Sequence, residues 1–426
     1  MADVRPFPAL RYAPAIDLQR VICPPFDTIS SKEQRRLYRL SPHNAVRLEL
    51  PKGGDPYKAA AKTLRQWLKK GILVRQEAPA FYVYQQEFRH AGQTYRRRVL
   101  FGRLRVEPWD SGSVLPHERT FSAPKEDRLN LLRSLRLNTS PIFLMYPDSQ
   151  HQVAPLIARA MSLPPEVEFG DGDGLSQRLW RVADPNVIAA INRGLQSEKL
   201  YVADGHHRYE TALVYSEESL AGAASLSEDA AEEFALVALV VVDDPGLLVL
   251  PIHRLVDIDL PLERALDSLI PMFEIEVRPS LADLLRDMAD RGPMVNSFGL
   301  VAAESPDFFL LTMFNRDAAE PFLPDDRSPA WRRLDTAIVT HVILRYALGL
   351  TDAQMEDIRT VRFSDDAEAA VAAVRKRRAR YALLLNPISP RGVLAIADRG
   401  ERMPQKSTFF YPKIPTGLLF NPLFGP

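Results

Sequence analysis

The sequence predicts a mixed α+β fold, and three features indicate it. Short apolar runs bounded by proline, glycine and aspartate recur along the chain and are typical of buried strands. Amphipathic stretches with a capping residue in front and glycine or basic residues behind lie between these runs and are typical of helices. The 426 residues, 46% of them hydrophobic, are enough for two or three domains with buried cores.

Composition narrows the functional classes. The 54 basic residues balance the 54 acidic ones, so no overall field attracts the chain to nucleic acid or to a membrane surface. The single cysteine, Cys23, excludes a disulfide framework and a cysteine-rich zinc site, and it fits a reducing compartment. The first residues lack the apolar core of a signal peptide, and the longest apolar run, Phe234 to Val242, is too short to span a bilayer. We therefore expect a cytoplasmic protein with no membrane partner.

The N-terminal part is predicted to form a rigid loop followed by a helix. A proline pair fixes an extended loop within residues 1–30, where Cys23 is expected to pack rather than react. Asp27 is either a site carboxylate or the cap of a helix that begins near Ser31. Residues 55–71 carry a cap, an early proline and a final glycine, which predicts a helix there.

A β-hairpin is expected next, with residues 81–89 and 94–106 flanking a glycine turn. Four arginines alternate with apolar residues on its second strand and form either a solvated face or, less commonly, a phosphate-binding face: Arg96, Arg98, Arg103 and Arg105.

The stretch from Val114 to Asn138 holds a polar cluster on a predicted loop. His117 and Glu118 can act as a base and its orienting partner, as two metal ligands, or as part of a salt-bridged surface loop. The loop is expected to include residues 121–124, and a short helix is predicted over residues 128–137.

The central stretch, residues 200–213, carries the strongest chemical signal. A short apolar run ends at Asp204-Gly205, and helical character resumes at Glu210, which predicts a strand, a tight turn and a helix. Such a turn leaves backbone N–H groups at the positive end of the helix dipole, and this is an anion-binding arrangement. His206, His207 and Arg208 add donors that suit phosphate oxygens. The alternative is a capped turn with surface histidines.

Further strands and helices alternate after this stretch. A strong turn at residues 243–246 separates two apolar strands, and His253-Arg254 follows as a second His-Arg pair. A helix is predicted over residues 331–349, with His341 as a core or boundary histidine, and Ser364-Asp365 is predicted to cap another helix. In the tail, Gln405 and Pro404 stand where a P-loop needs other residues, so a Walker A motif is rejected. Lys406, Ser407 and Thr408 line either a polar site or a plain turn.

Several motifs resemble, in order, a widespread bacterial family, domain of unknown function 1015, often labelled SpoOJ/ParB-like. They are ICPPFDTIS, PHERT followed by PK-DRLNLL, NTSPIF, ADGHHRYETAL, DPGLLVLPIHR and MPQKSTFFYPK. The DGHHR turn also looks like that of free-serine kinases in the ParB/sulfiredoxin superfamily, where the turn holds nucleotide phosphates. His206 stands where sulfiredoxin has its catalytic cysteine, so sulfinic-acid reduction is not expected. Neither a helix-turn-helix nor a basic balance supports ParB-type DNA binding.

The resemblance implies a ParB/sulfiredoxin-like core with large insertions over residues 1–256. A C-terminal α/β domain would cover residues 257–426, and its tail, residues 403–413, would return to the site. The leading hypothesis is a nucleotide-binding phosphotransferase that acts on a small hydroxyl substrate and uses ATP or ADP, or alternatively CTP, with Mg²⁺. The acceptor's base would be Glu118 or Asp27. A homo-oligomer is compatible with the sequence.

The residues assigned to this hypothesis have distinct roles. The predicted catalytic residues are Asp204, Glu118 and His207, and Asp204 would also hold the metal. The predicted cofactor-binding residues are Gly205, His206, His207, Arg208, His117, Arg254 and Lys406. Two alternatives remain: a non-catalytic nucleotide-sensing module, and a metal-dependent hydrolase that uses His117, Glu118, His206 and His207. The hydrolase is less favoured because no H-E-x-x-H spacing occurs.

Overall fold

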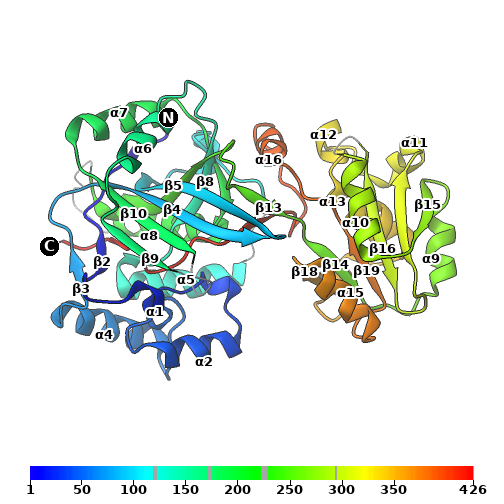
Figure 1. Cartoon of the computed structure of the whole chain (residues 1–426), viewed down its shortest axis with the longest axis horizontal. Helices are drawn as coiled ribbons and strands as arrows, with labels where there is room; N and C mark the ends of the chain where they lie inside the picture. Colours follow the sequence, from blue (N-terminus) through cyan, green and yellow to red (C-terminus); the bar gives the residue numbers. More distant parts are fainter. Residues whose placement is uncertain (119–121, 171–174, 222–228, 293–294, 426) are drawn as a thin grey trace. The chain divides into compact units, whose positions relative to one another are not determined.

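The computed structural model describes residues 1–118, 122–170, 175–221, 229–292 and 295–425. Its combination of helices and sheets confirms the predicted α+β class. The chain forms two compact units, which Figure 1 shows coloured along the sequence. The first unit comprises Met1–Pro116, Thr120–Leu248 and Pro412–Pro426, and the second comprises His117–Arg119 and Val249–Tyr411. The domain boundary after residue 256 stays a prediction, because compact units need not coincide with domains.

The first unit is built on a large mixed sheet. Its strand order is β6-β11-β8-β12-β5-β4-β10-β9, and β1 pairs with β5. The hairpin β4–β5 confirms the predicted one, and β8 runs parallel to β12 and antiparallel to β11. The strands of this sheet are β1 (Val4–Arg5), β4 (Phe81–His90), β5 (Gln93–Arg105), β6 (Val114–Leu115), β8 (Ile142–Tyr146), β9 (Val167–Gly170), β10 (Ser176–Val182), β11 (Leu200–Asp204) and β12 (Phe234–Val241).

Two cores stabilise the first unit. One face of the sheet packs against α6, α7 and α8, with Ile157, Ile191 and Tyr209 buried on it. A second core lies among the N-terminal helices, where Trp67 and Leu131 are buried. The helices of this unit are α1 (Leu18–Val21), α2 (Ser31–Leu40), α3 (Val46–Glu49), α4 (Pro56–Lys69), α5 (Ser122–Leu135), α6 (Ala154–Met161), α7 (Pro185–Gln196) and α8 (His206–Ala221). Two small sheets complete it, β2 (Leu10–Tyr12) with β3 (Leu73–Arg75) and β7 (Leu137–Asn138) with β21 (Asn421–Pro422).

The predicted helix over residues 55–71 is confirmed, and one predicted loop is corrected. The Asp55 side chain accepts from the N–H of Lys58, Pro56 opens α4, and the helix ends at Lys69. By contrast, α5 begins at Ser122, inside the segment expected to be a loop. A proline in the first turn of a helix removes only an N–H that has no intrahelical partner, so Pro124 does not prevent this start.

The second unit is a six-stranded antiparallel sheet with helices on both faces. Its strand order is β15-β17-β16-β19-β14-β18. Neighbouring residues of one strand enter different cores: Leu300 and Leu311 pack with α9, and Val301 and Leu310 pack with α10 and α15. This alternation is the period of two that strands impose. The strands are β14 (His253–Val256), β15 (Phe273–Arg278), β16 (Ser297–Ala302), β17 (Phe308–Met313), β18 (Val361–Ser364) and β19 (Tyr381–Leu384), and β13 (Leu248–Leu250) pairs separately with β20 (Phe409–Tyr411).

Helices of the second unit differ from the prediction in two places. The predicted helix over residues 331–349 is two short helices followed by a π-helix, Val339–Ala347. The cap of α15 is Asp366 rather than Ser364-Asp365, because its side chain accepts from the N–H of Ala369. The α-helices of this unit are α9 (Leu262–Leu269), α10 (Leu281–Asp290), α11 (Arg316–Ala319), α12 (Pro329–Arg332), α13 (Asp335–Ile338), α14 (Asp352–Glu356), α15 (Ala367–Arg375) and α16 (Pro390–Ala397). Of the helices in the described ranges, none is both long and apolar enough to cross a membrane.

The turn between β12 and β13 brings the backbone of Gly246 close to the backbone of Arg96 and Arg97. A substitution at Gly246 therefore tests the packing of the first unit. A Cβ at Gly246 would lie 2.3 Å from the carbonyl oxygen of Arg96 and 2.4 Å from the N of Arg97. We expect Gly246→Ala to lower the free energy of unfolding by about 1–3 kcal/mol, because the backbone must shift to admit the methyl group. Gly54→Ala is the matched control, since nothing lies within 4 Å of a Cβ there. Equal urea midpoints for the two variants would contradict this packing.

Candidate functional site

The candidate site begins where β11 passes into α8. The strand ends at Asp204 and the helix begins at His206, so Gly205 forms the turn. Gly205 has a φ of +93°, a conformation that side chains rarely adopt, and a Cβ there would lie 2.9 Å from Nε of Arg208. The predicted strand, glycine turn and helix are therefore confirmed. The first N–H groups of any α-helix lack partners within the helix, so this turn has the backbone of an anion site.

Two cations meet on the Asp204 carboxylate. Nη2 of Arg208 donates to Oδ2 at 2.5 Å, and Nζ of Lys413 donates to Oδ1 at 2.7 Å. Arg208 also donates to the carbonyl oxygen of Pro141. The side chains of Asp204, Arg208 and Lys413 are only 12–17% exposed, so solvent screens their interaction weakly. Because two positive side chains share one carboxylate, the net charge of these three side chains beside the turn is positive.

The C-terminal segment lies beside the N-terminal loop, and this places Lys413. Cys23 donates its N–H to the carbonyl oxygen of Thr416 at 3.1 Å, and Thr416 donates back at 2.8 Å. Burial raises the pKa of the Cys23 thiol, with the Glu49 carboxylate acting in the same direction, so the thiol stays protonated and packs as predicted. The same loop continues into Asp27, which lies in a short 3₁₀ turn, Phe26–Thr28. Asp27 does not cap the helix that begins at Ser31, because the Ser30 side chain accepts from the N–H of Glu33 there.

Arg97 supports the site from inside the sheet. Its side chain is fully buried, and Nη2 donates to Oε1 of Gln86 at 2.6 Å and to the carbonyl oxygen of Pro412 at 2.5 Å. Its guanidinium also lies 5.0 Å from the centre of the Phe143 ring. Burial lowers the pKa of Arg97 to about 10, so it remains charged near neutral pH. Because Pro412 precedes Lys413, Arg97 positions the residue that pairs with Asp204.

Two carboxyl groups at this turn have pKa values displaced in opposite directions. Burial alone would raise the pKa of Asp204, but Lys413 and Arg208 outweigh it and hold this pKa well below its usual range. Asp27 is exposed at the surface of its turn, but the many protein atoms around its carboxyl group and the negative charge of Asp204 raise its pKa from the ordinary value, while Arg208 and Lys413 oppose the shift. Asp204 is therefore a fixed negative charge, and Asp27 is the carboxyl group better placed to accept a proton.

The two histidines of the turn differ in exposure. His206 is buried, and its positive form would favour the ionised state of Asp204. His207 is half-buried on the next position of the helix. Both residues make interactions in the folded chain. Their assignment to cofactor binding, and that of His207 to catalysis, stay predictions.

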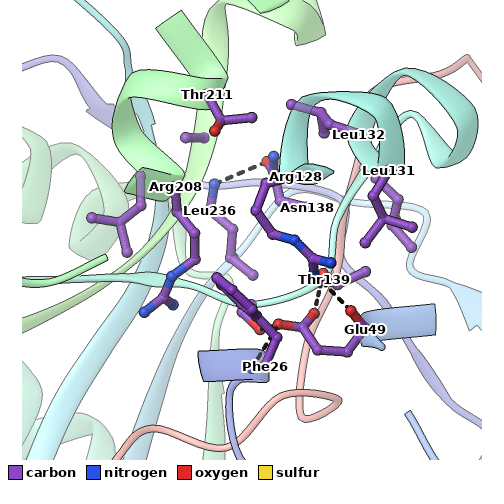
Figure 2. Close-up of a pocket in the computed structure, with 14 residues that line it drawn as sticks. Phe26, Glu49, Arg128, Leu131, Leu132, Asn138, Thr139, Arg208, Thr211 and Leu236 are labelled. Carbon is purple, nitrogen blue, oxygen red and sulfur yellow. Dashed lines mark hydrogen bonds between the residues drawn. The ribbon is translucent and has the colours of Figure 1, made fainter. Parts of the chain in front are cut away.

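A small cavity of about 50 Å³ opens beside Arg208, and Figure 2 shows the side chains that line it. Its polar wall is the buried Glu49, whose carboxylate accepts from Oγ1 of Thr139 at 2.5 Å and from Oγ of Ser140 at 2.7 Å. Nη1 of Arg128 donates to the backbone oxygen of Glu49 at 2.7 Å. This space suits a few water molecules. No sequence pattern points to Glu49, since a single glutamate in a short helix is common.

His117 and Glu118 belong to the second unit and are held by the tail. Nε2 of the buried His117 lies 3.0 Å from Oγ1 of Thr408, and the N–H of Ser407 donates to Oε1 of Glu118 at 3.1 Å. Nε2 of His117 is 3.8 Å from Oε1 of Glu118. These contacts resemble a structural connection between the loop and residues 403–408 more than an exposed surface pair. Arg119 and Thr120 of the same motif lie outside the described residues.

Arg254 and Lys406 are the remaining predicted site residues. Arg254 is buried in the second unit, where Nη1 donates to the carbonyl oxygen of Ile252 at 2.5 Å. Lys406 is exposed and has a φ of +58°. The structure thus brings Asp204, Gly205 and Arg208 together in the first unit. His117, Glu118 and Arg254 lie in the second unit, and their part in a joint site stays a prediction.

The described side chains do not form a ready-made metal site. Within the described part of the chain, no group of three or more His, Cys, Asp or Glu side chains is arranged to hold a metal ion. Both oxygens of Asp204 already accept from cations. Mg²⁺ is often bound through one or two carboxylates together with substrate phosphates, so Asp204 would fit the ion only once a phosphorylated ligand is present.

Comparison with known proteins identifies the family. A family model described as "Protein of unknown function (DUF1015)" matches residues 4–337. The chain belongs to this family. The predicted membership is therefore confirmed, whereas the ParB and SpoOJ labels stay predictions. No curated protein matches the DUF1015 chain.

Solved structures similar to this DUF1015 protein include three with different descriptions. A conserved hypothetical protein from Pyrococcus furiosus has 14% identity and a TM-score of 0.32, over 75% of this chain and 95% of that one. A mutant free serine kinase in complex with ADP has 12% identity and a TM-score of 0.35, over 75% and 92%. A C-terminally truncated SbnI from Staphylococcus aureus has 11% identity and a TM-score of 0.37, over 75% and 86%. These identities and TM-scores are too low to support an argument about function, which therefore depends on the residues of the site alone.

Proposed function

We propose that this DUF1015 protein binds a nucleotide by its phosphates at the β11–α8 turn and transfers a phosphoryl group to a small hydroxyl substrate. The observation that carries the proposal is the meeting of Arg208 and Lys413 on Asp204 at the glycine turn. These cations come from the start of α8 and from the C-terminal segment, and they frame the N-terminus of a 16-residue helix. Helix N–H groups with flanking Arg and Lys side chains are the donors that phosphate oxygens prefer.

The phosphate donor proposed is ATP or ADP, with CTP as the alternative. Gly205 lets the backbone approach the phosphates without a side chain, and Arg208 and Lys413 supply positive charge to them. When bound through phosphate oxygens, Mg²⁺ would neutralise further charge. Asp204 keeps the two cations in place before the nucleotide arrives, so the site is preorganised.

Asp27 is the proposed general base. Its raised pKa lets it accept the proton of the acceptor hydroxyl as the oxygen attacks the terminal phosphorus. The bond from that phosphorus to the bridging oxygen breaks, and the shortened nucleotide leaves with the electron pair. Asp204 stays ionised throughout, because Lys413 and Arg208 stabilise its charge. Glu118 was the other candidate for this role and is held by Ser407 in the second unit.

A thermal-shift panel tests phosphate binding at the turn. With ATP, ADP, CTP or pyrophosphate and Mg²⁺, we expect the wild type to be stabilised, by about 2.7 kcal/mol when the ligand is at 100 times its Kd. Arg208→Ala should lose most of this ligand-induced shift, because it removes charged hydrogen bonds to phosphate. The shift is measured against each variant's own ligand-free melting temperature, which separates binding from the stability change.

Arg98→Ala is the matched control, since it removes an arginine that pairs with Asp244 at 3.1 Å in the same unit. It should keep the full ligand-induced shift. A wild type that no nucleotide stabilises, or an Arg208→Ala variant that responds like Arg98→Ala, would overturn phosphate binding at this turn. A shift without any phosphorylated product from a panel of hydroxyl compounds, serine included, would instead support the nucleotide-sensing module.

A further inference from the structure

The second unit contains a cavity of about 370 Å³ that the proposed function does not use. This volume suits a small organic molecule. Its walls are mainly apolar and aromatic, and they include Trp331, Leu344, Met355 and Phe363. Several charged side chains also line it, and the most deeply buried of them is Arg254. An apolar cavity with a few convergent polar groups is the usual composition of a small-molecule site.

Arg254 is a buried charge without a carboxylate partner. The residue is 2% exposed, and its polar contacts are to backbone oxygens, Ile252 at 2.5 Å and Gln405 at 3.5 Å. The guanidinium also lies 4.9 Å from the centre of the Phe363 ring. Burial lowers the pKa of Arg254 to about 10, with the charge of Glu118 opposing, so it is protonated at neutral pH. A buried charge of this kind is costly unless an anion compensates it.

A π-helix, which is a rare helix geometry, forms another part of the cavity wall. The π-helix Val339–Ala347 contributes Thr340, His341 and Leu344 to the cavity. π-Helical turns are uncommon and occur frequently at functional sites. Desolvation and the nearby Arg345 lower the pKa of His341 to about 4, so its ring is neutral. Arg345 donates to Nδ1 at 3.0 Å, which leaves the ring proton on Nε2 as a donor.

Four other charged groups at the cavity are paired with one another. Arg345 forms an ion pair with Asp352. Arg327 lies 3.7 Å from Asp326 and stacks over the Trp331 ring, 5.6 Å from its centre. Glu356 and Arg402 also line the cavity, and Arg254 is the buried guanidinium whose hydrogen bonds are to backbone oxygens. The buried Arg254 therefore matches a ligand that carries a single negative charge.

We propose that this cavity is a second ligand site, which binds a small organic carboxylate with an apolar or aromatic body. The carboxylate would pair with the Arg254 guanidinium and accept from Nε2 of His341. The apolar body would pack between Trp331, Leu344 and Met355. This ligand differs in chemistry from the nucleotide proposed for the β11–α8 turn, so each proposal can be tested independently of the other.

Calorimetric titration of the full chain with benzoate tests the proposal. Benzoate has the charge and the apolar ring that the site requires. Benzamide is its uncharged analogue, and inorganic phosphate is an anion without an apolar body. We expect benzoate to bind at least tenfold more tightly than either control, because only benzoate satisfies both Arg254 and the aromatic wall. Absence of benzoate binding to the wild type, or equal binding of benzamide, would overturn the site.

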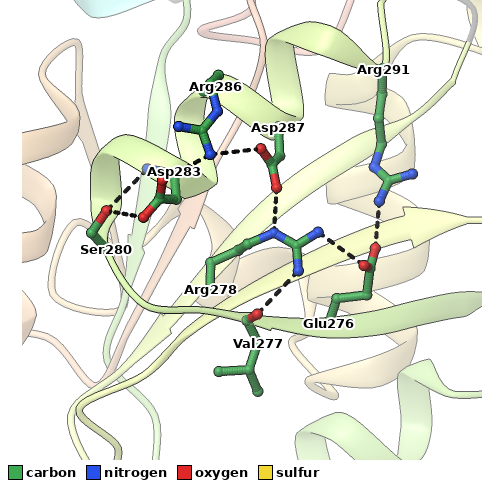
Figure 3. A network of polar contacts seen from close by, with 8 residues as sticks. All are labelled: Glu276, Val277, Arg278, Ser280, Asp283, Arg286, Asp287 and Arg291. Atoms are coloured by element: carbon green, nitrogen blue, oxygen red, sulfur yellow. Dashed lines mark hydrogen bonds and ion pairs between the residues drawn. The ribbon is translucent and has the colours of Figure 1, made fainter.

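Variants locate the binding. Arg254→Met keeps the length of the side chain and should weaken benzoate binding at least tenfold. The control is Arg278→Met, which removes an arginine of the same unit from the network in Figure 3, where it donates to Glu276 at 2.9 Å and to Asp287. It should bind benzoate as the wild type does. Retained binding in Arg254→Met would overturn the proposal.

A second variant decides the matter if Arg254→Met does not fold. His341→Phe keeps a ring against Trp331, whose centre lies 5.7 Å away, and removes the Nε2 donor. We expect about a tenfold loss of benzoate affinity, and unchanged affinity would count against the site. Arg208→Ala, which lies at the nucleotide turn, should leave benzoate binding intact.

Discussion

Replacing Asp27 with asparagine is expected to lower kcat for phosphoryl transfer by about 10²–10⁴-fold, the usual contribution of a general base. Asparagine has nearly the same shape as aspartate but cannot take the proton of the acceptor hydroxyl. Nucleotide binding should persist, because Arg208 and Lys413 are untouched. The measurement is ³¹P NMR of product formation from ATP or ADP with a panel of small hydroxyl compounds, serine included.

The pH profile of the wild type gives a second readout of Asp27. A base must be deprotonated to act, so the rate should fall as the pH drops through the raised pKa of Asp27, above its ordinary value of 3.8. Asp17→Asn is the matched control. Asp17 is exposed on the same N-terminal segment and accepts from the N–H of Gln19 at 3.0 Å, so its loss should spare activity. Equal rates for wild type and Asp27→Asn would remove Asp27 from the mechanism.

Replacing Asp204 with asparagine is expected to lower the free energy of unfolding by about 3–5 kcal/mol, the cost of breaking a buried ion pair. The change leaves Arg208 and Lys413 weakly solvated and without their shared counter-charge. Urea denaturation of both proteins measures the difference. Glu218→Gln is the matched control: its pair with Arg133 is exposed at 43–44%, so its loss should cost less than about 1 kcal/mol.

The sign of the pH dependence follows from the direction of the pKa shift. Because the folded-state pKa of Asp204 is depressed, its stabilising contribution is fully present above the unfolded value of about 3.9. The contribution is lost as the pH falls below that value toward the lower folded pKa. The stability gap between wild type and Asp204→Asn should therefore be constant near neutral pH and shrink only in strong acid. A gap that is absent at pH 7 would contradict the ion-pair geometry.

Local elements of the fold could be predicted because their causes are local. Asp55 and Pro56 set the start of α4, and Gly205 permits the turn after β11. A cap or a positive φ depends on a few neighbouring residues, so the sequence suffices. Two of the predictions that were wrong concern continuity: α5 begins inside a predicted loop at Ser122, and the helix expected over residues 331–349 contains a π-helix.

Arg97 shows a signal that the sequence contained and that was missed. Side chains of a strand alternate between its two faces, so Arg97 shares a face with Val99 and Phe101, both buried. Arg96 and Arg98 lie on the other face of the same strand. An arginine on an apolar strand face is rare, and this pattern indicates a side chain that supports a polar site.

The sequence by itself determined the mixed fold class, the glycine turn at Gly205 and the motifs of the DUF1015 family. Only the tertiary structure decided which residues surround that turn. Lys413 donates to Asp204 although the two residues are 209 positions apart in sequence. Asp27, which interacts electrostatically with Asp204, comes from the N-terminal segment. Contacts of this kind depend on strand order and on the pairing of two distant segments at Cys23 and Thr416. Local periodicity carries no information about such pairing, because it results from long-range burial of the whole core.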